Sequence, residues 1–204
     1  MDLGAGDGRF VLKTAATCPG WLIVGIDANA GSMAEASRRA RRPPKRGGLP
    51  NALFVVAAAE SLPPELAGFA DAVTVYFPWG SLLRGLLLAD PAILVNIARI
   101  MRPGATLTVL LSVTEHDRID GIVGIDEQRV AALAPVYAAH GLRLEECQPA
   151  TADDIARSHS SWAKRLGAGQ SRLVWRLQFR RSEPEVELAG HRDSAVFQGR
   201  ERQI

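Results

Sequence analysis

The chain has 204 residues, of which 47% are hydrophobic and 23% are charged, and its formal net charge is +2. This composition is typical of one globular domain with a sizeable core, and so small a net charge says little about partners. No apolar run reaches the roughly 18 to 20 residues that cross a bilayer, which excludes a membrane-spanning protein. Cys18 and Cys147 lie far apart in no metal-ligand spacing, so we expect reduced thiols, no metal site and a cytoplasmic location.

Apolar runs that favour strands alternate with helical stretches along most of the chain. In chain order, the predicted elements are a strand at 22–27, a helix at 31–42, strands at 53–58 and 72–77, a helix at 91–101, a strand at 105–113, a helix at 126–140, a strand starting at 142–146, a helix at 152–166 and a strand at 172–179. Such alternation with short links predicts an α/β fold with a doubly wound sheet. We expect one domain over 1–181 and a disordered tail over 182–204, where periodicity is lost.

The start of the chain differs from what this fold predicts. Met1–Leu3 runs directly into a glycine-rich turn, with almost no strand before it. In a doubly wound sheet the strand before such a turn is central and buried. We therefore expect the chain as given to be truncated inside its first strand, as a misplaced start codon or a fragment would produce.

Gly4, Gly6 and Gly8 occupy alternate positions of this turn, immediately before a helical stretch. Glycines permit a tight turn and a close approach of backbone to a ligand, and the helix amides then face that ligand. A dinucleotide-binding fingerprint needs glycine at the position of Arg9, which argues against a nicotinamide oxidoreductase. Asp27 closes the next predicted strand nineteen residues after Gly8, where a carboxylate can accept hydrogen bonds from ribose hydroxyls. The alternative is a structural turn followed by a helix-capping Asp27.

The glycine spacing resembles motif I of the class I methyltransferases, which use S-adenosylmethionine (SAM) and have a Rossmann-like sheet. This resemblance implies SAM as the cofactor and a binding site at the carboxyl ends of several predicted strands. Beyond the three glycines and Asp27, the residues it assigns to cofactor binding are Asp2, Ala58, Ala59, Glu60, Phe77, Pro78 and Ser81. For Glu60 a surface acid is the alternative, and for Ser81 ordinary helix capping.

Two further segments make the resemblance more specific. Residues 76–84, with the sequence YFPWGSLLR, and 160–166, with SSWAKRL, resemble the aminoglycoside-resistance 16S rRNA methyltransferases that modify N1 of adenine 1408. N1 lies on the Watson–Crick edge, so such an enzyme must extract the base from its stack. The resemblance implies that Trp79 and Trp162 stack on the flipped adenine, that Ser160 lies near the target, and that the partner is 16S rRNA in the 30S subunit.

Each of these roles has a plainer alternative. The two indoles could be core residues and Ser160 a helix cap, although neither indole lies in an apolar stripe. Trp21 and Trp175 begin or occupy predicted strands, so we expect both in the core. Direct attack by the neutral N1 lone pair needs no general base, which agrees with the lack of an obvious catalytic His or Cys pair.

Cations gather in two parts of the chain. Residues 38–46 contain six cations in nine positions and no acid, and a second group lies late in the chain. Such clusters can neutralise phosphates, and a solvated surface is the alternative. The resemblance assigns rRNA contacts to Arg38, Arg39, Arg41, Arg42, Lys45, Arg46, Lys164, Arg165 and Arg172.

Two other functions remain open from the sequence. A SAM methyltransferase for another RNA or a small molecule would keep the glycine turn and Asp27, but would not need the tryptophan pair or the cation clusters. An RNA-binding relative without catalysis would have lost cofactor binding, against which the intact turn argues. The family carries a segment before motif I that is missing here, so we expect reduced stability or activity of this chain. We expect a monomer that makes no membrane contact and, if active, gives aminoglycoside resistance.

Overall fold

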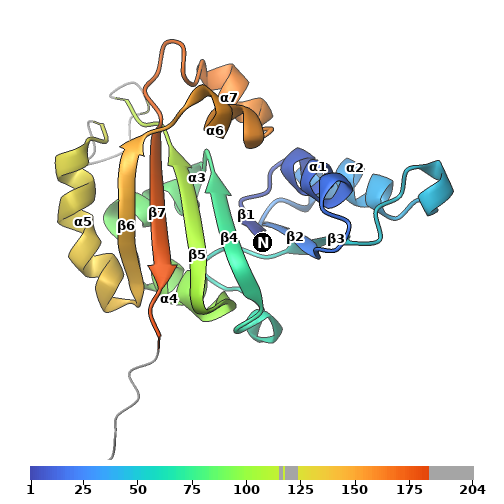
Figure 1. Cartoon of the computed structure of the whole chain (residues 1–204), viewed down its shortest axis with the longest axis horizontal. Coiled ribbons are helices and arrows are strands. Elements are labelled where there is room, and N and C mark those ends of the chain that lie inside the picture. The colour runs from blue at the N-terminus through green and yellow to red at the C-terminus, as the bar shows by residue number, and fades with distance from the viewer. Residues whose placement is uncertain (115–116, 118–123, 184–204) are drawn as a thin grey trace, which may run out of the picture.

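The computed structural model describes residues 1–114, 117 and 124–183, and contains one seven-stranded sheet in the order β3-β2-β1-β4-β5-β7-β6 (Figure 1). Strands β1 to β5 are parallel, while β7 lies antiparallel between β5 and β6. The strand bounds are β1 Asp2–Leu3, β2 Ile23–Asp27, β3 Ala52–Val56, β4 Ala70–Tyr76, β5 Met101–Leu111, β6 Leu142–Pro149 and β7 Trp175–Arg181. The predicted α/β doubly wound sheet is confirmed, and the strand order reverses at β1 and β4.

Helices cover both faces of the sheet and one of its ends. Their bounds are α1 Arg9–Thr17, α2 Ala30–Ala40, α3 Gly80–Leu88, α4 Pro91–Ile100, α5 Glu127–Ala139, α6 Ala152–Arg157 and α7 Ser161–Leu166, with short 3-10 turns η1 Pro44–Arg46 and η2 Pro64–Leu66. Helices α6 and α7 lie at the end toward which β4 and β5 point (Figure 1). Within the described ranges, no single helix is long and apolar enough to span a bilayer, and only α3 and α4 together, bent by 96°, match a span in length and composition.

Strand β2 shows how the alternation of side chains builds two cores. Ile23 joins a cluster with α1 and α2, whereas Val24 and Ile26 join the larger cluster with α3, α4 and α5. Gly25 lies on the α1 side, where a Cβ would come within 2.8 Å of a Val11 methyl group. Helix α1 therefore packs directly on the β2 backbone, and its N-terminus is held at the carboxyl end of the sheet.

Strand β1 is short but central. Asp2 and Leu3 are both buried and pair with β2 on one side, and Asp2 also pairs with Thr74 of β4 on the other. This position carries the glycine turn that follows β1 to the middle of the sheet edge, where doubly wound folds bind ligands.

Several sequence predictions need correction. The helix predicted over 152–166 is two helices, because His159 has a left-handed backbone (φ 48°) and Ser160 caps the start of α7. Helix α3 was not predicted, and the last strand begins at Trp175 rather than Arg172. Trp21 is 64% exposed, not in the core, while Trp175 is buried as expected. The predicted tail lies outside the described residues from position 184 onward.

Candidate active site

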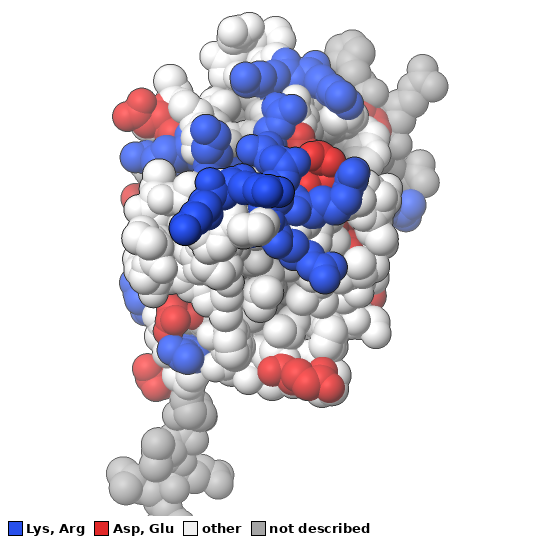
Figure 2. Space-filling model, turned by 90° about the vertical axis from the view of Figure 1, so that its right-hand side faces the viewer, with Lys and Arg blue, Asp and Glu red and all other residues white. Residues whose placement is uncertain are grey.

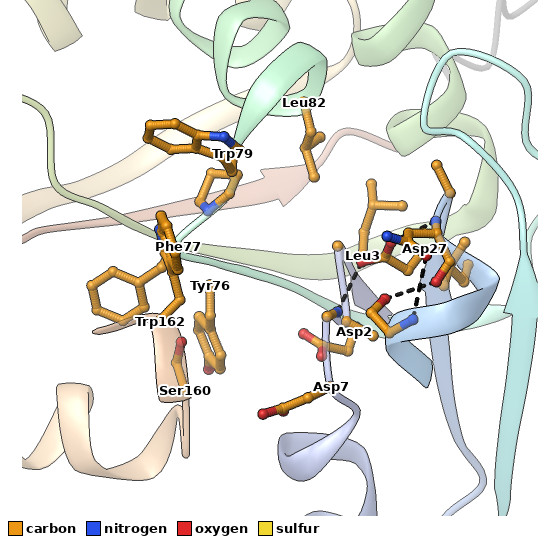
Figure 3. A pocket seen from close by; sticks show the side chains of 18 of the residues that line it. Asp2, Leu3, Asp7, Asp27, Tyr76, Phe77, Trp79, Leu82, Ser160 and Trp162 are labelled. Carbon is orange, nitrogen blue, oxygen red and sulfur yellow. Dashed lines mark hydrogen bonds between the residues drawn. The ribbon is translucent and has the colours of Figure 1, made fainter. Parts of the chain in front are cut away.

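A pocket of about 640 Å³ opens at the carboxyl ends of the parallel strands, beside the point where the strand order reverses. The loops after β1, β2, β3 and β4 form most of its wall, and the α6–α7 segment closes the rest. Figure 3 shows Asp2 and Asp27 on one side of this pocket and Trp79 and Trp162 on the other. Each site residue that the sequence assigned to the cofactor, except Gly8, lines this one pocket.

The three glycines of the turn all have positive φ, with values of 78° for Gly4, 54° for Gly6 and 70° for Gly8. L-residues rarely adopt this backbone conformation. A Cβ at Gly8 would also meet Ala36 at 2.6 Å and Phe54 at 2.7 Å, so helix α2 and β3 pack against the turn. Gly6 differs, because it lines the pocket and no atom lies within 4 Å of its Cβ position. Its backbone therefore leaves room for a ligand to approach closely.

Asp27 is fixed against this turn by backbone hydrogen bonds. Gly6 N donates to one carboxylate oxygen and Asn29 N to the other, each at 2.8 Å. Asn29, not Asp27, caps helix α2 by accepting from Gly31 N and Ser32 N, so the helix-capping alternative for Asp27 is wrong. Each carboxylate oxygen keeps a free lone pair, and the group can still accept hydrogen bonds from a diol in the pocket.

Asp2 is a buried carboxylate that lines the same pocket. Thr74 Oγ1 donates a 2.7 Å hydrogen bond to it. The pKa of Asp2 is raised to about 6, chiefly by burial and to a smaller extent by the nearby Asp27 carboxylate, while the Thr74 hydrogen bond and the N-terminal ammonium group act in the opposite direction. A carboxylate held dry at the wall of a pocket is stabilised when a cationic ligand group lies beside it.

The remaining cofactor-side residues form a less polar wall. Ala58, Ala59 and Glu60 follow β3, and Asn96 Nδ2 donates a 2.8 Å hydrogen bond to the Glu60 carbonyl oxygen, which fixes this loop on α4. Tyr76 lies against Phe10 with ring centroids 5.0 Å apart, and burial raises the pKa of its phenol to about 12. The phenol therefore stays protonated at neutral pH.

Trp79 and Trp162 meet at the other side of the pocket, with ring centroids 5.4 Å apart and an interplanar angle of 62°. Trp79 is 56% exposed on the β4–α3 connection, so the core alternative is wrong for it. Trp162 is partly buried in α7, and its indole N–H has no hydrogen-bond partner among the described residues. In this edge-to-face contact the two rings leave no room for a third ring between them.

A strained residue precedes each of these indoles. Phe77 has a φ of 51° two positions before Trp79, and His159 has a φ of 48° three positions before Trp162. A non-glycine residue in this conformation costs on the order of 1–3 kcal/mol, and such residues cluster at ligand sites. Both left-handed residues thus lie shortly before a tryptophan that lines the pocket, and Figure 3 shows Phe77, Trp79 and Trp162 on the same side of it.

One hydrogen bond joins the two sides of the pocket. Ser161 Oγ donates to an Asp7 carboxylate oxygen at 2.8 Å, between residues 154 positions apart. Asp7 belongs to the glycine turn, and Ser161 precedes Trp162 at the start of α7. No sequence pattern pointed to this pair. The neighbouring Ser160 lines the pocket, and its hydroxyl accepts from Ala163 N at 3.1 Å, so it does cap α7.

Cations are concentrated on the face that Figure 2 presents, which lies on the α1 and α2 side of Figure 1. The cations of residues 38–46 are exposed, and only Arg38 among them forms an ion pair in the structure as described, with Glu35 at 2.8 Å. Lys164 and Arg165 are exposed on α7. We call the exposed cations of residues 38–46, Lys164 and Arg165 the basic surface, and of these Arg165 also lines the pocket.

Arg172 does not belong to this surface. Its side chain is only 14% exposed and forms an ion pair with Asp117, and it also donates to Thr114 Oγ1 at 3.3 Å. This position does not fit the phosphate contact predicted for Arg172, because a carboxylate already occupies its guanidinium. Arg172 instead ties the segment before β7 to the segment after β5. In the part of the chain that the structure describes, no group of three His, Cys, Asp or Glu could hold a metal ion.

Comparisons with known proteins point to one family. A family model described as NpmA, 16S rRNA (adenine(1408)-N(1))-methyltransferase, matches residues 1–180. A protein of that description from Streptoalloteichus tenebrarius is 36% identical over 180 residues, which cover 85% of this chain and 82% of that protein. One from Escherichia coli is 31% identical over 187 residues, which cover 87% and 84%.

Solved structures give the same result. A tryptophan-to-alanine mutant of the Catenulisporales acidiphilia enzyme of this description, with its cosubstrate SAM, superposes with a TM-score of 0.83 at 32% identity, covering 90% of this chain and 85% of that one. The aminoglycoside resistance methyltransferase NpmB1 superposes with a TM-score of 0.75 at 41% identity, covering 88% and 85%. The chain therefore belongs to the 16S rRNA (adenine(1408)-N(1))-methyltransferase family.

Proposed function

We propose that this chain transfers the methyl group of SAM to N1 of adenine 1408 in the 16S rRNA of the 30S subunit, and thereby gives resistance to aminoglycosides. The observation that carries this function is the single pocket in which a glycine turn and two carboxylates face a pair of tryptophans. A methyltransferase for a small molecule would not need an exposed indole at the pocket mouth or a basic surface beside it.

The residues on the carboxylate side fit SAM. Buried Asp2 would lie beside the ammonium group of the methionine part, and Asp27 would accept hydrogen bonds from the ribose hydroxyls. Gly6 gives the space for close approach, and Ala58, Ala59 and Glu60 would meet the adenine, with Phe77, Pro78 and Ser81 completing the wall. When bound, SAM supplies an electrophilic methyl group on a sulfonium.

The residues on the tryptophan side would hold the target base. Trp79 and Trp162 would stack on the two faces of the flipped adenine, and this requires the rings to separate from their present edge-to-face contact. Trp79 is exposed and can rotate away, whereas Trp162 is fixed on α7. With SAM bound, the neutral N1 lone pair would form the new bond to the methyl carbon while the bond from that carbon to sulfur breaks, which would leave a neutral thioether and a positive charge on the base. The protein removes no proton, and its contribution is positioning. Ser160, at the cap of α7, lies where it can orient the base.

The same proposal covers the organisation of the protein. Residues 1–181 form the catalytic domain, which acts as a monomer on 30S subunits in the cytoplasm. No metal ion is needed, because a sulfonium leaving group requires no Lewis acid. The phosphate contacts come from the exposed cations of residues 38–46 and from Lys164 and Arg165. Such contacts position the enzyme on folded rRNA without reading its sequence.

Primer extension across helix 44 of 16S rRNA tests this function. Purified 30S subunits are incubated with the protein, with and without SAM, and reverse transcription is read through adenine 1408. A stop that depends on SAM is expected, because a methyl group on N1 blocks base pairing. If the protein binds SAM by calorimetry but produces no stop, adenine 1408 is not its target. If it binds 30S subunits but no SAM, the chain is an inactive relative.

A further inference from the structure

A second pocket, of about 510 Å³, lies between α1 and the α6–α7 segment. It shares His159 and Ser160 with the active-site pocket, so the two are neighbours. The Asp7–Ser161 hydrogen bond lies at the same junction and holds α1 and α7 as its opposite walls. Of the residues that line this space, which we call the α1–α7 groove, only Ser160 and Lys164 have a role described above.

The rim of the α1–α7 groove is cationic. Arg9 and Lys13 come from α1 and Lys164 from α7, and no Asp or Glu is among the residues that line the groove. Arg9 and Lys13 are four positions apart, so they lie on one face of α1. Lys13 and Lys164 are exposed and form no ion pair with any described residue, while Arg9 Nε lies 3.2 Å from the Asp7 carboxylate. The groove therefore carries unneutralised positive charge.

The floor of the groove is apolar, which favours an anion attached to a carbon-rich group over a free inorganic anion. It is lined by Ile155, Ala156, Ala163, Gly167 and Ala168, with the polar groups of Gln170 and His159 at its edge. A free inorganic anion keeps its hydration and gains nothing from such a floor. A sugar carries carbon-rich surface and is joined to a charged phosphate, so a ribose–phosphate unit matches both the floor and the rim.

We propose that the α1–α7 groove binds the ribose–phosphate of the RNA strand beside the flipped target nucleotide. This inference rests on the proposed function, because it requires a base in the neighbouring pocket. A nucleotide whose base enters that pocket leaves its backbone at the mouth, and the strand must continue over the adjoining surface. The α1–α7 groove adjoins the mouth at His159 and Ser160 and offers three cations there. Arg9 and Lys13 thereby extend the RNA contact onto α1, and Gln170, in the turn after α7, adds a polar group on the other wall.

Binding of 30S subunits to the Lys13→Ala variant over a series of salt concentrations tests this proposal. The logarithm of the affinity falls linearly with the logarithm of the salt concentration, and each lost phosphate contact makes this fall less steep, by about 0.7 to 0.9. We expect this reduction for Lys13→Ala, with a raised KM for 30S subunits and unchanged kcat and SAM affinity. The matched control is Arg143→Ala, which removes an exposed cation from the start of β6, at the other end of the sheet.

The outcomes separate this inference from the function on which it rests. If the unmodified protein gives the stop at adenine 1408 and Lys13→Ala keeps the full salt slope, the groove binds no phosphate and the inference fails alone. If the unmodified protein gives no stop, both fail together. A slope reduced equally by Arg143→Ala would show a diffuse charge effect, which also overturns the groove as a site. Lys13→Glu gives an independent check, because repulsion should weaken 30S binding beyond the loss seen with alanine.

Discussion

The two sides of the active-site pocket are built in different ways. On the cofactor side, Asp27 and the glycine turn come from the first 27 residues and are fixed to one another by backbone hydrogen bonds. On the target side, Trp79 and Trp162 are 83 positions apart in the chain, and only the fold brings them into contact. A site held by its own backbone is formed before the ligand arrives, whereas one made of exposed side chains adjusts to it. Changes on one side should therefore leave the other largely intact.

The largest effect is expected for the indoles. Trp162→Ala and Trp79→Ala should each lower methylation of 30S subunits by about 5- to 150-fold, because stacking of a base on an aromatic ring is worth about 1–3 kcal/mol. SAM affinity by calorimetry should stay close to that of the unmodified protein. Trp21→Ala is the matched control, since Trp21 is exposed but lies outside both pockets. Equal loss of methylation and SAM binding would mean that the indoles have a structural role.

The reverse experiment changes the cofactor side. Asp27→Asn should weaken SAM binding by about 10- to 100-fold, because hydrogen bonds to a charged group contribute about 1.5–3 kcal/mol. Glu65→Gln is the control, since Glu65 is an exposed acid in η2. If 30S binding in the absence of SAM also fell for Asp27→Asn, the two sides would not be independent.

Asp2 should make SAM binding depend on pH. The pKa of Asp2 is about 6 in the folded protein, so the carboxylate that pairs with the SAM ammonium is lost as pH falls through 6. SAM affinity should fall by up to about tenfold per pH unit below this value, as a single protonation requires. Calorimetric titrations between pH 5 and 7 measure this change, and Asp2→Asn should bind weakly with no such dependence. A pH profile unchanged in Asp2→Asn would assign the titration to another group.

The raised pKa of Asp2 also lowers the free energy of unfolding of the protein without cofactor at neutral pH. The unfolded chain loses this proton near 3.8, the ordinary pKa of an aspartic acid, while the folded chain keeps it up to about 6. Unfolding therefore becomes easier as pH rises between these values, and the loss persists above pH 6. Asp2→Asn without SAM should accordingly be more stable than the unmodified protein at pH 7, by up to roughly 3 kcal/mol. Denaturant melts at pH 4 and pH 7 would show it, and equal differences at both would contradict it.

The smallest effect is expected for the bond between the two sides. Ser161→Ala removes the hydrogen bond to the Asp7 carboxylate, whose side chain is 38% exposed. Because water competes for this carboxylate, we expect the bond to contribute less than one to a buried charge, about 1 kcal/mol. The ratio of 30S affinities with and without SAM should then differ by about 3- to 10-fold from that of the unmodified protein. A double-mutant cycle with Asp7→Asn measures the pair directly. Additive losses in that cycle would show that the bond couples nothing.

The cofactor side of the pocket could be predicted from the sequence more completely than the contacts that join distant segments. The glycine turn, Asp27 and most strands are local patterns, so they were found. Trp21 was misplaced because it precedes β2, which begins only at Ile23. The pairing of Arg172 with Asp117 and of Asp7 with Ser161 joins segments 55 and 154 positions apart, which no local pattern reports. The break before α7 depends on the left-handed His159. Histidine adopts this conformation more often than most non-glycine residues, but still uncommonly, so its presence alone does not predict a break.

The left-handed residues before the two indoles have a consequence for how this protein can be improved. Phe77 and His159 are two of the three non-glycine residues with positive φ among those described. Replacing such a residue by glycine relieves strain, so an engineer searching for a more heat-resistant variant would be drawn to these positions. Both lie shortly before a tryptophan that lines the pocket. A glycine at either position would make the backbone more flexible, so the indole ring would no longer be held in one orientation. Thermostability and turnover should therefore trade against each other at Phe77 and His159.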